Sequence, residues 1–224
     1  MLQPGWIELK RNGITACRVL LLVAGSVLLA GCGLLGVGSG ASSGTPGDAP
    51  VAAPSPELEA RYASLVADLK STDQARAAAA VDAMKTFSRE HPDLAGPLLN
   101  LGLVRVRVGD PAGALALFNE AAAVCSRCGP VWNEIGVLDA HQGRFADAEQ
   151  AYRRAIELAP DDAAAYYNLA ILYELYIPRP ELAVQNYEQY LQLGGDGKDV
   201  EKWLVDLRRR VNDVAKAARA DGRS

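Results

Sequence analysis

Small, aromatic and aliphatic residues recur at a constant spacing after residue 56, which for Gly102 and Gly136 is 136 − 102 = 34. When the sequence is compared with itself at this offset, small residues align with small residues and aromatic residues with aromatic ones. The aligned pairs are Gly102 with Gly136, Gly109 with Gly143, Ala114 with Ala148, Phe118 with Tyr152 and Ala121 with Ala155. A third copy begins at Ala163, and a fainter copy precedes residue 95. The pattern predicts pairs of antiparallel helices that approach closely at their small residues.

The copy at 129–162 shows the pattern most completely, with Trp132, Ile135, Gly136, Gly143, Phe145, Ala148, Tyr152, Ala155 and Pro160. This arrangement resembles the tetratricopeptide repeat. The resemblance implies an all-α solenoid of about four helix-turn-helix pairs. The pairs are expected to stack, because no hairpin alone buries its apolar face. The expected units are a degenerate hairpin at 57–94 and repeats at 95–128, 129–162 and 163–197. The last of these repeats carries a one-residue insertion within 176–180.

A further apolar stripe follows the last copy. Its residues step by three or four positions, which is the spacing of one helical face. They are Val200, Trp203, Leu204, Leu207, Val211, Val214 and Ala218. We therefore predict that 198–224 forms a helix that caps the solenoid, followed by a short tail.

Residues 1–31 have the features of a secretory signal peptide. An apolar run at 19–30 follows three basic residues, Lys10, Arg11 and Arg18. The run is too short to span a hydrocarbon core, which takes roughly 20 residues. Leu29-Ala30-Gly31-Cys32 resembles the lipobox of bacterial lipoproteins, which implies cleavage before Cys32 and acylation of its thiol. Several acyl chains, each worth about 0.8 kcal/mol per buried methylene, would anchor the protein to a membrane.

Residues 32–56 consist of the lipidated cysteine and a segment rich in Gly, Ser and Pro. Such a segment buries too little apolar area to offset chain entropy, so we predict a disordered linker. The residue after Cys32 is Gly33, whereas in the best-studied bacteria an Asp at this position retains lipoproteins at the inner membrane. By this analogy we expect the inner leaflet of the outer membrane, facing the periplasm of a Gram-negative bacterium.

The charge of the chain argues against a nucleic-acid partner. The chain has 23 basic and 27 acidic residues, and removal of Lys10, Arg11, Arg18 and Glu8 with the leader leaves 20 − 26 = −6. A mildly acidic protein lacks the basic footprint of a nucleic-acid-binding protein. The basic cluster at 208–210 is interpreted as the solvated face of the last helix, with contact to anionic lipid as the weaker alternative.

Residues that could perform catalysis are sparse. His91 and His141 are the two histidines, and they lie far apart in the sequence. No H-E-x-x-H segment, phosphate-binding loop or paired metal-ligand spacing occurs in the sequence. We therefore expect a protein that is not an enzyme and that uses no cofactor and no metal.

Cys125 and Cys128 are the two cysteines that remain when the leader and Cys32 are set aside. An even pair in an oxidising compartment favours a structural disulfide, here after a helix that ends near Val124. Two alternatives stay open. A redox-active pair would need a helix N-terminus to lower a thiol pKa, and this pair follows a helix; half of a metal site would need further ligands. The alternative function is therefore an envelope thiol–disulfide or metal-handling protein that uses Cys125 and Cys128.

The tetratricopeptide resemblance also implies a binding groove. In that fold the first helix of each pair lines a concave surface, chiefly through repeat positions 5, 9, 12 and 13. The predicted groove residues are Leu99, Leu103, Arg107, Asn133, Val137, His141, Tyr167, Ile171 and Glu174. Chaperone-binding members grip a terminal carboxylate with basic residues at such positions, but here only Arg107 is present. An apolar peptide or helix of an envelope protein is the expected partner.

Tyr167 is the predicted hot spot of this groove, with little contribution to stability. The sequence as a whole predicts a membrane-anchored protein–protein interaction scaffold. It would serve the assembly or operation of an envelope complex. This complex is either a secretin or pilus system, with a pilotin-like role, or a TonB/Tol-type machine.

Overall fold

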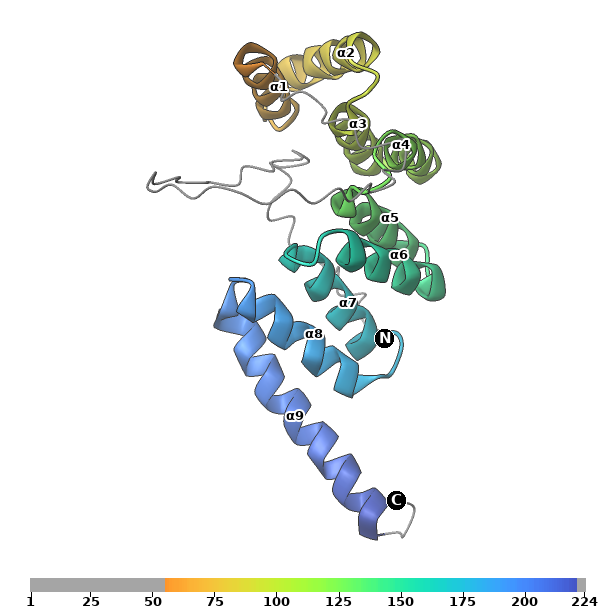
Figure 1. Cartoon of the computed structure of the whole chain (residues 1–224), viewed down its shortest axis with the longest axis vertical. Coiled ribbons are helices and arrows are strands. Elements are labelled where there is room, and N and C mark those ends of the chain that lie inside the picture. The colour runs from red at the N-terminus through yellow and green to blue at the C-terminus, as the bar shows by residue number, and fades with distance from the viewer. Residues whose placement is uncertain (1–54, 221–224) are drawn as a thin grey trace, which may run out of the picture.

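The computed structural model describes residues 55–220 of the 224-residue chain, and this part folds into nine α-helices without a strand (Figure 1). The first eight helices form four hairpins: α1 (Pro56–Leu69) with α2 (Gln74–Glu90), α3 (Ala95–Arg107) with α4 (Pro111–Val124), α5 (Gly129–His141) with α6 (Phe145–Leu158), and α7 (Ala163–Leu175) with α8 (Pro180–Gln192). The last helix, α9 (Gly197–Ala220), follows α8. The predicted all-α solenoid with a C-terminal helix is confirmed. The predicted signal peptide, Cys32 and the linker up to residue 54 lie outside the described residues.

Local signals in the sequence determine where the helices begin and end. Asp110 caps α4, since its carboxylate accepts a hydrogen bond from the backbone N–H of Gly113 at 2.9 Å. Gly109 and Gly143 follow α3 and α5 with φ of 78° and 75°, which residues with a Cβ rarely adopt. The turn between α7 and α8 covers 176–179, one residue more than the turns at 108–110 and 142–144. The extra residue of the third copy therefore lies in this turn.

Within two hairpins, a glycine on one helix receives an aromatic ring from the other. A Cβ built on Gly102 would overlap the ring of Phe118, and one built on Gly136 would lie 2.7 Å from Cδ1 of Tyr152. Both rings are fully buried. The glycine and aromatic positions that recur from copy to copy are thus the points where the paired helices touch.

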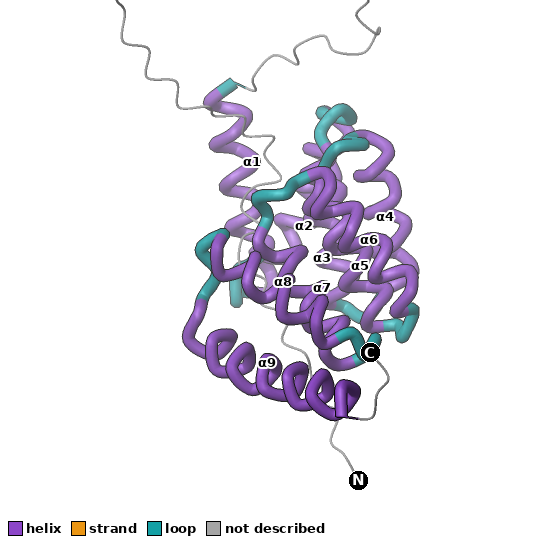
Figure 2. The backbone as a smooth tube through the Cα atoms, turned by 60° about the horizontal axis from the view of Figure 1, so that its bottom comes forward, coloured by secondary structure: helices purple, strands orange, loops and turns teal. Residues whose placement is uncertain are grey.

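The hairpins stack one on the next (Figures 1 and 2). Buried apolar side chains pack between them. The largest group of buried side chains surrounds α7, and α9 contributes Val200, Leu204 and Leu207 to it. The C-terminal part of α9 extends beyond α8 (Figure 1), and Val214 is 65% exposed. No helix within residues 55–220 has the length and apolar character needed to cross a membrane.

Candidate functional site: the inner face

The first helices of successive hairpins lie next to one another and form what we call the inner face: α1, α3, α5 and α7. A buried hydrogen bond joins α7 to α5, and a partly buried one joins α3 to α1. Asn168 Nδ2 on α7 donates to Asn133 Oδ1 on α5 at 2.9 Å, and Asn100 Nδ2 on α3 donates to Tyr62 Oη on α1 at 2.6 Å. Buried polar groups need such partners, because an unmet hydrogen bond in the interior costs about 1–3 kcal/mol. These side chains therefore serve the contact between repeats.

Because of this stacking, some of the residues predicted to line the groove are buried. Leu99, Asn133 and Tyr167 occupy repeat position 5, and they are 0%, 5% and 7% exposed. Leu99 belongs to the buried group around α3 and α5, while the ring of Tyr167 packs 4.9 Å from the ring centroid of Tyr190. The prediction that these three residues form an open binding surface is wrong. Position 5 faces the contact with neighbouring helices of the solenoid instead of solvent.

Repeat position 9 is also largely enclosed. Ile171 is buried, Val137 is half-buried, and Leu103 keeps a small exposed area that lines a pocket described below. Ile171 and Leu103 are both core residues by their burial, at 8% and 7% exposed, which corrects their predicted place on an open groove. Leu103 keeps only the small area that lines the pocket. The accessible part of the inner face therefore lies mainly at positions 12 and 13, near the C-terminal ends of its helices.

Positions 12 and 13 recur as three neighbouring pairs along the solenoid. Arg107 and His141 are exposed, as are Val106 at 37% and Leu175 at 61%. Because each copy of the repeat supplies one such pair, the stacking of the hairpins places the pairs in a row on successive helices. The row combines apolar and basic side chains with one carboxylate, that of Glu174.

Glu174 lies in this row but already has partners. Its carboxylate accepts a hydrogen bond from Tyr187 Oη at 3.0 Å and pairs with Arg210 of α9 at 2.7 Å. Burial raises the pKa of the Tyr187 hydroxyl, and the charge of Glu174 raises it further, so this hydroxyl stays protonated and donates. At the α7 end of the inner face, the negative charge is therefore compensated within the described residues.

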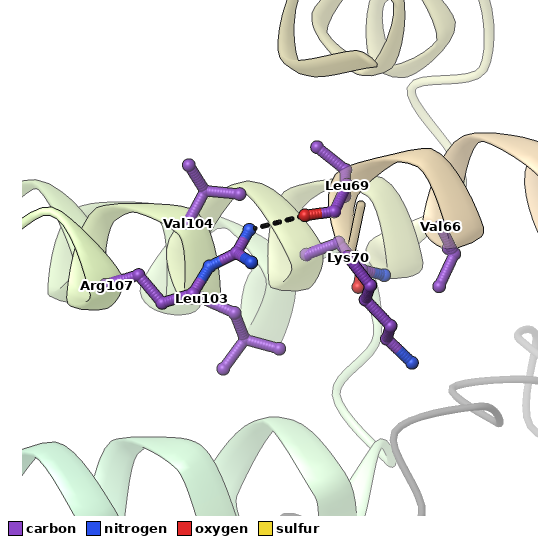
Figure 3. Close-up of a pocket in the computed structure, with 7 residues that line it drawn as sticks. Val66, Leu69, Lys70, Leu103, Val104 and Arg107 are labelled. Carbon is purple, nitrogen blue, oxygen red and sulfur yellow. Dashed lines mark hydrogen bonds between the residues drawn. The ribbon is translucent and has the colours of Figure 1, made fainter. Parts of the chain in front are cut away.

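A shallow pocket opens at the other end, between α1 and α3 (Figure 3). It has a volume of about 210 Å³. Its walls are the side chains of Val66, Leu69, Leu103 and Val104, and its polar groups come from Lys70, Asn100 and Arg107. Arg107 Nη2 donates to the backbone carbonyl of Leu69 at 2.9 Å, which satisfies one of the carbonyls left open at the end of α1.

The predicted groove contained Leu103 and Arg107 of this pocket and missed its other lining residues, which are Val66, Leu69, Lys70, Asn100 and Val104. Asn100 and Val104 lie on α3 beside the predicted positions, whereas Val66, Leu69 and Lys70 lie at the end of α1, whose repeat copy is too degenerate to align by self-comparison. One signal was available, because Lys70 directly follows Leu69 at the end of an apolar helical stripe, where basic residues favour helix C-termini. That signal marks the helix end, but the approach of α1 to α3 exists only in the folded chain.

A disulfide joins Cys125 and Cys128 in the turn between α4 and α5. Cys125 is the C-cap of α4, and Cys128 is the N-cap of α5. The expectation that this pair only follows a helix was incomplete, since Cys128 also begins one. Attack on a disulfide needs access to one of its sulfurs: Cys128 is buried, whereas Cys125 is only half-buried. Among residues 55–220, no group of three or more His, Cys, Asp or Glu side chains is placed to hold a metal ion.

We expect Cys125→Ala/Cys128→Ala to lower the free energy of unfolding by about 2 kcal/mol, since a short loop is no longer closed in the unfolded chain. Urea titration of both proteins under oxidising conditions measures this difference. Under a reducing agent, the free energy of unfolding of the parent protein should fall towards that of the double variant. A structural disulfide leaves partner capture by the variant intact, whereas a thiol–disulfide or metal-handling function would be lost outright.

Comparison with known proteins agrees with this architecture. Residues 128–194 match the tetratricopeptide repeat family. Similar solved structures include PilF of Pseudomonas aeruginosa, with 23% identity, 72% of this chain and 73% of that chain covered, and a TM-score of 0.59. The protein TTC0263 of Thermus thermophilus has 23% identity, 67% and 80% coverage and a TM-score of 0.56. MamA from Desulfovibrio magneticus RS-1 has 18% identity, 75% and 92% coverage and a TM-score of 0.54.

No curated protein sequence matches this chain significantly. At the identities found, the solved structures show the fold: an all-α tetratricopeptide solenoid with a C-terminal helix. Proteins of this repeat type are generally non-enzymatic scaffolds for protein–protein interaction. On the inner face, the accessible row and the pocket are therefore the candidate surfaces for such an interaction.

Proposed function

We propose that this protein is a lipid-anchored scaffold of the Gram-negative envelope that binds another envelope protein on its inner face. The observation that carries the proposal is the accessible row at repeat positions 12 and 13. Val106 on α3 and Leu175 on α7 expose apolar surface there, and the basic side chain of Arg107 is exposed in the same row. Exposed apolar groups arranged in a row suit a peptide or helix with matching apolar side chains.

The anchor is part of the proposal, and its support is the lipobox-like segment Leu29-Ala30-Gly31-Cys32. Attachment through Cys32 to the inner leaflet of the outer membrane would place the solenoid in the periplasm. We expect Cys32→Ser to abolish acylation, because serine lacks the thiol that receives the lipid. The protein should then leave the membrane fraction or persist with its leader. Unchanged processing and membrane fractionation would contradict the lipoprotein assignment.

Two roles fit such a scaffold: pilotin-like assembly of a secretin or pilus, and service to a TonB/Tol-type complex. The pilus-related role should be tested first, because PilF of Pseudomonas aeruginosa has a similar fold. Since the identity is 23%, this likeness extends to the fold alone. The decision between the two roles comes from the protein that is captured.

Capture from crosslinked cells tests the binding surface. We expect Val106→Asp/Leu175→Asp to reduce capture of the principal partner about thirtyfold, the loss that follows from about 2 kcal/mol at a binding hot spot. Both side chains are exposed, so helicity and melting temperature should stay close to those of the parent. Quantitative mass spectrometry of the crosslinked partner measures the effect.

The matched control is Val205→Asp/Val214→Asp on α9, which changes two apolar residues of 69% and 65% exposure. It adds the same charge away from the inner face and should leave capture unchanged. If the control variant loses the partner and the inner-face variant keeps it, the binding surface is α9. If neither variant loses it, the inner face is not the docking surface.

A further inference from the structure

The pocket between α1 and α3 carries two positive charges. Lys70 and Arg107 are both exposed lining residues of this pocket. Neither forms an ion pair with a carboxylate of residues 55–220, whereas the nearby Arg76 and Arg105 pair with Asp68 and Asp110. Within the described part of the chain, the positive charge at this pocket is therefore not neutralised.

The position of Arg107 is already set before anything binds. Its guanidinium uses one donor on the carbonyl of Leu69. Arginine has five N–H donors in a planar fork, so others remain for a second acceptor. A group held in place in this way loses less conformational entropy on binding. Figure 3 shows the side chain of Lys70 extending to the same side of the ribbon as that of Leu103.

The size and lining of the pocket limit what can enter. Its volume of about 210 Å³ lies below the roughly 300–1,000 Å³ typical of small-molecule sites. Val66, Leu69 and Leu103 are themselves 7%, 3% and 7% exposed, so they form a fixed apolar wall. A pocket of this size accommodates a side chain or two of a bound segment, with apolar groups against the wall and an anion at the rim.

We propose that this pocket binds an acidic side chain of the partner segment, next to an apolar side chain that packs against the half-buried Val104 and the exposed edge of Leu103. The inference rests on the proposed function, because it assumes that a segment of a partner lies on the inner face. It extends the proposed function by naming the chemical character of the bound segment and the direction in which that segment lies along the inner face. The acidic residue lies at the α1–α3 end, since at the α7 end Glu174 is already compensated by Arg210.

Selection from a random peptide library displayed on phage tests this inference with the purified full chain in detergent. The parent protein should enrich peptides in which Asp or Glu adjoins Leu, Ile or Val. Lys70→Glu should weaken the best such peptide about tenfold or more and shift the selection towards Lys and Arg, because opposite charges attract and like charges repel. Raising the salt concentration should weaken binding to the parent protein, since the pair is partly exposed.

Lys216→Glu is the matched control, because it makes the same charge change on an exposed residue of α9, at the opposite end of the solenoid (Figure 1). It should leave both the selected sequences and the affinity unchanged. If the selected peptides bind at Val106 and Leu175 but are not enriched in Asp or Glu, the inference is overturned and the proposed binding surface is kept. A selection unaltered by Lys70→Glu would also overturn it. If no peptide binds to the inner face, both the inference and the proposed binding surface fail.

Discussion

Tyr167→Ala should lower the free energy of unfolding by about 3–5 kcal/mol, the loss expected when a large aromatic side chain is removed from a packed interior. Tyr167 is 7% exposed, and its ring lies near Tyr190, at a centroid distance of 4.9 Å, and Tyr187, at 6.1 Å. The same buried group includes Val200 and Leu204 of α9. Removal of the ring should therefore loosen both the last hairpin and its cap. Urea titration followed by circular dichroism measures the change.

Leu175→Ala is the control on the same helix, since Leu175 is 61% exposed. It should change the free energy of unfolding by less than about 0.5 kcal/mol, as exposed substitutions usually do. A stability of the Tyr167→Ala variant equal to that of the parent would mean that the ring is a surface group. That result would restore the interpretation of Tyr167 as a binding residue and contradict its burial.

Phe118→Ala should also cost about 3–5 kcal/mol, because it empties the space between α3 and α4. Phe118 is fully buried over Gly102. In the parent protein Gly102→Ala should destabilise by about 1–3 kcal/mol, because the new methyl group would occupy the same space as the ring. In the Phe118→Ala background the same change should become stabilising by about 0.5–1 kcal/mol, since alanine favours the helix over glycine. Urea titration of the four proteins measures both effects.

Gly136→Ala supplies the comparison for this reversal. Its methyl group would meet Tyr152, which is untouched by the change at Phe118. Gly136→Ala should therefore stay destabilising in both backgrounds. The opposite result is that Gly102→Ala stays destabilising when Phe118 is absent. In that case the ring of Phe118 is not the reason for a glycine at position 102. The contact between these two repeat positions would then not explain why they recur.

The sequence by itself determined the helices and their pairing. Self-comparison at a constant offset aligned Gly102 with Gly136 and Phe118 with Tyr152, and these are the residues that touch within two hairpins. The turns after α3 and α5 carry Gly109 and Gly143, whose positive φ a glycine adopts at little cost. Such features depend on near neighbours and on repetition, so they can be identified without a fold.

The C-terminal helix was predicted for the same reason. A stripe of apolar residues at steps of three or four defines one face of a helix wherever that helix lies. The first part of the stripe packs against the solenoid through Val200, Leu204 and Leu207, whereas Val214 is largely exposed. The periodicity identified the apolar face of α9. It did not identify the residue at which the solenoid stops covering that face.

Only the tertiary structure decided which side of each inner helix faces solvent. Leu99, Asn133 and Tyr167 share a repeat position, but their burial depends on how closely the neighbouring helices approach. The pocket depends on such an approach as well, since Arg107 bonds to the carbonyl of Leu69 across a sequence separation of 38 residues. A helical pattern records which residues share a face, but the rotation and distance between helices arise from the packing of all their side chains. For this reason the sequence predicted a solenoid with an inner surface, and the fold selected the accessible residues of that surface.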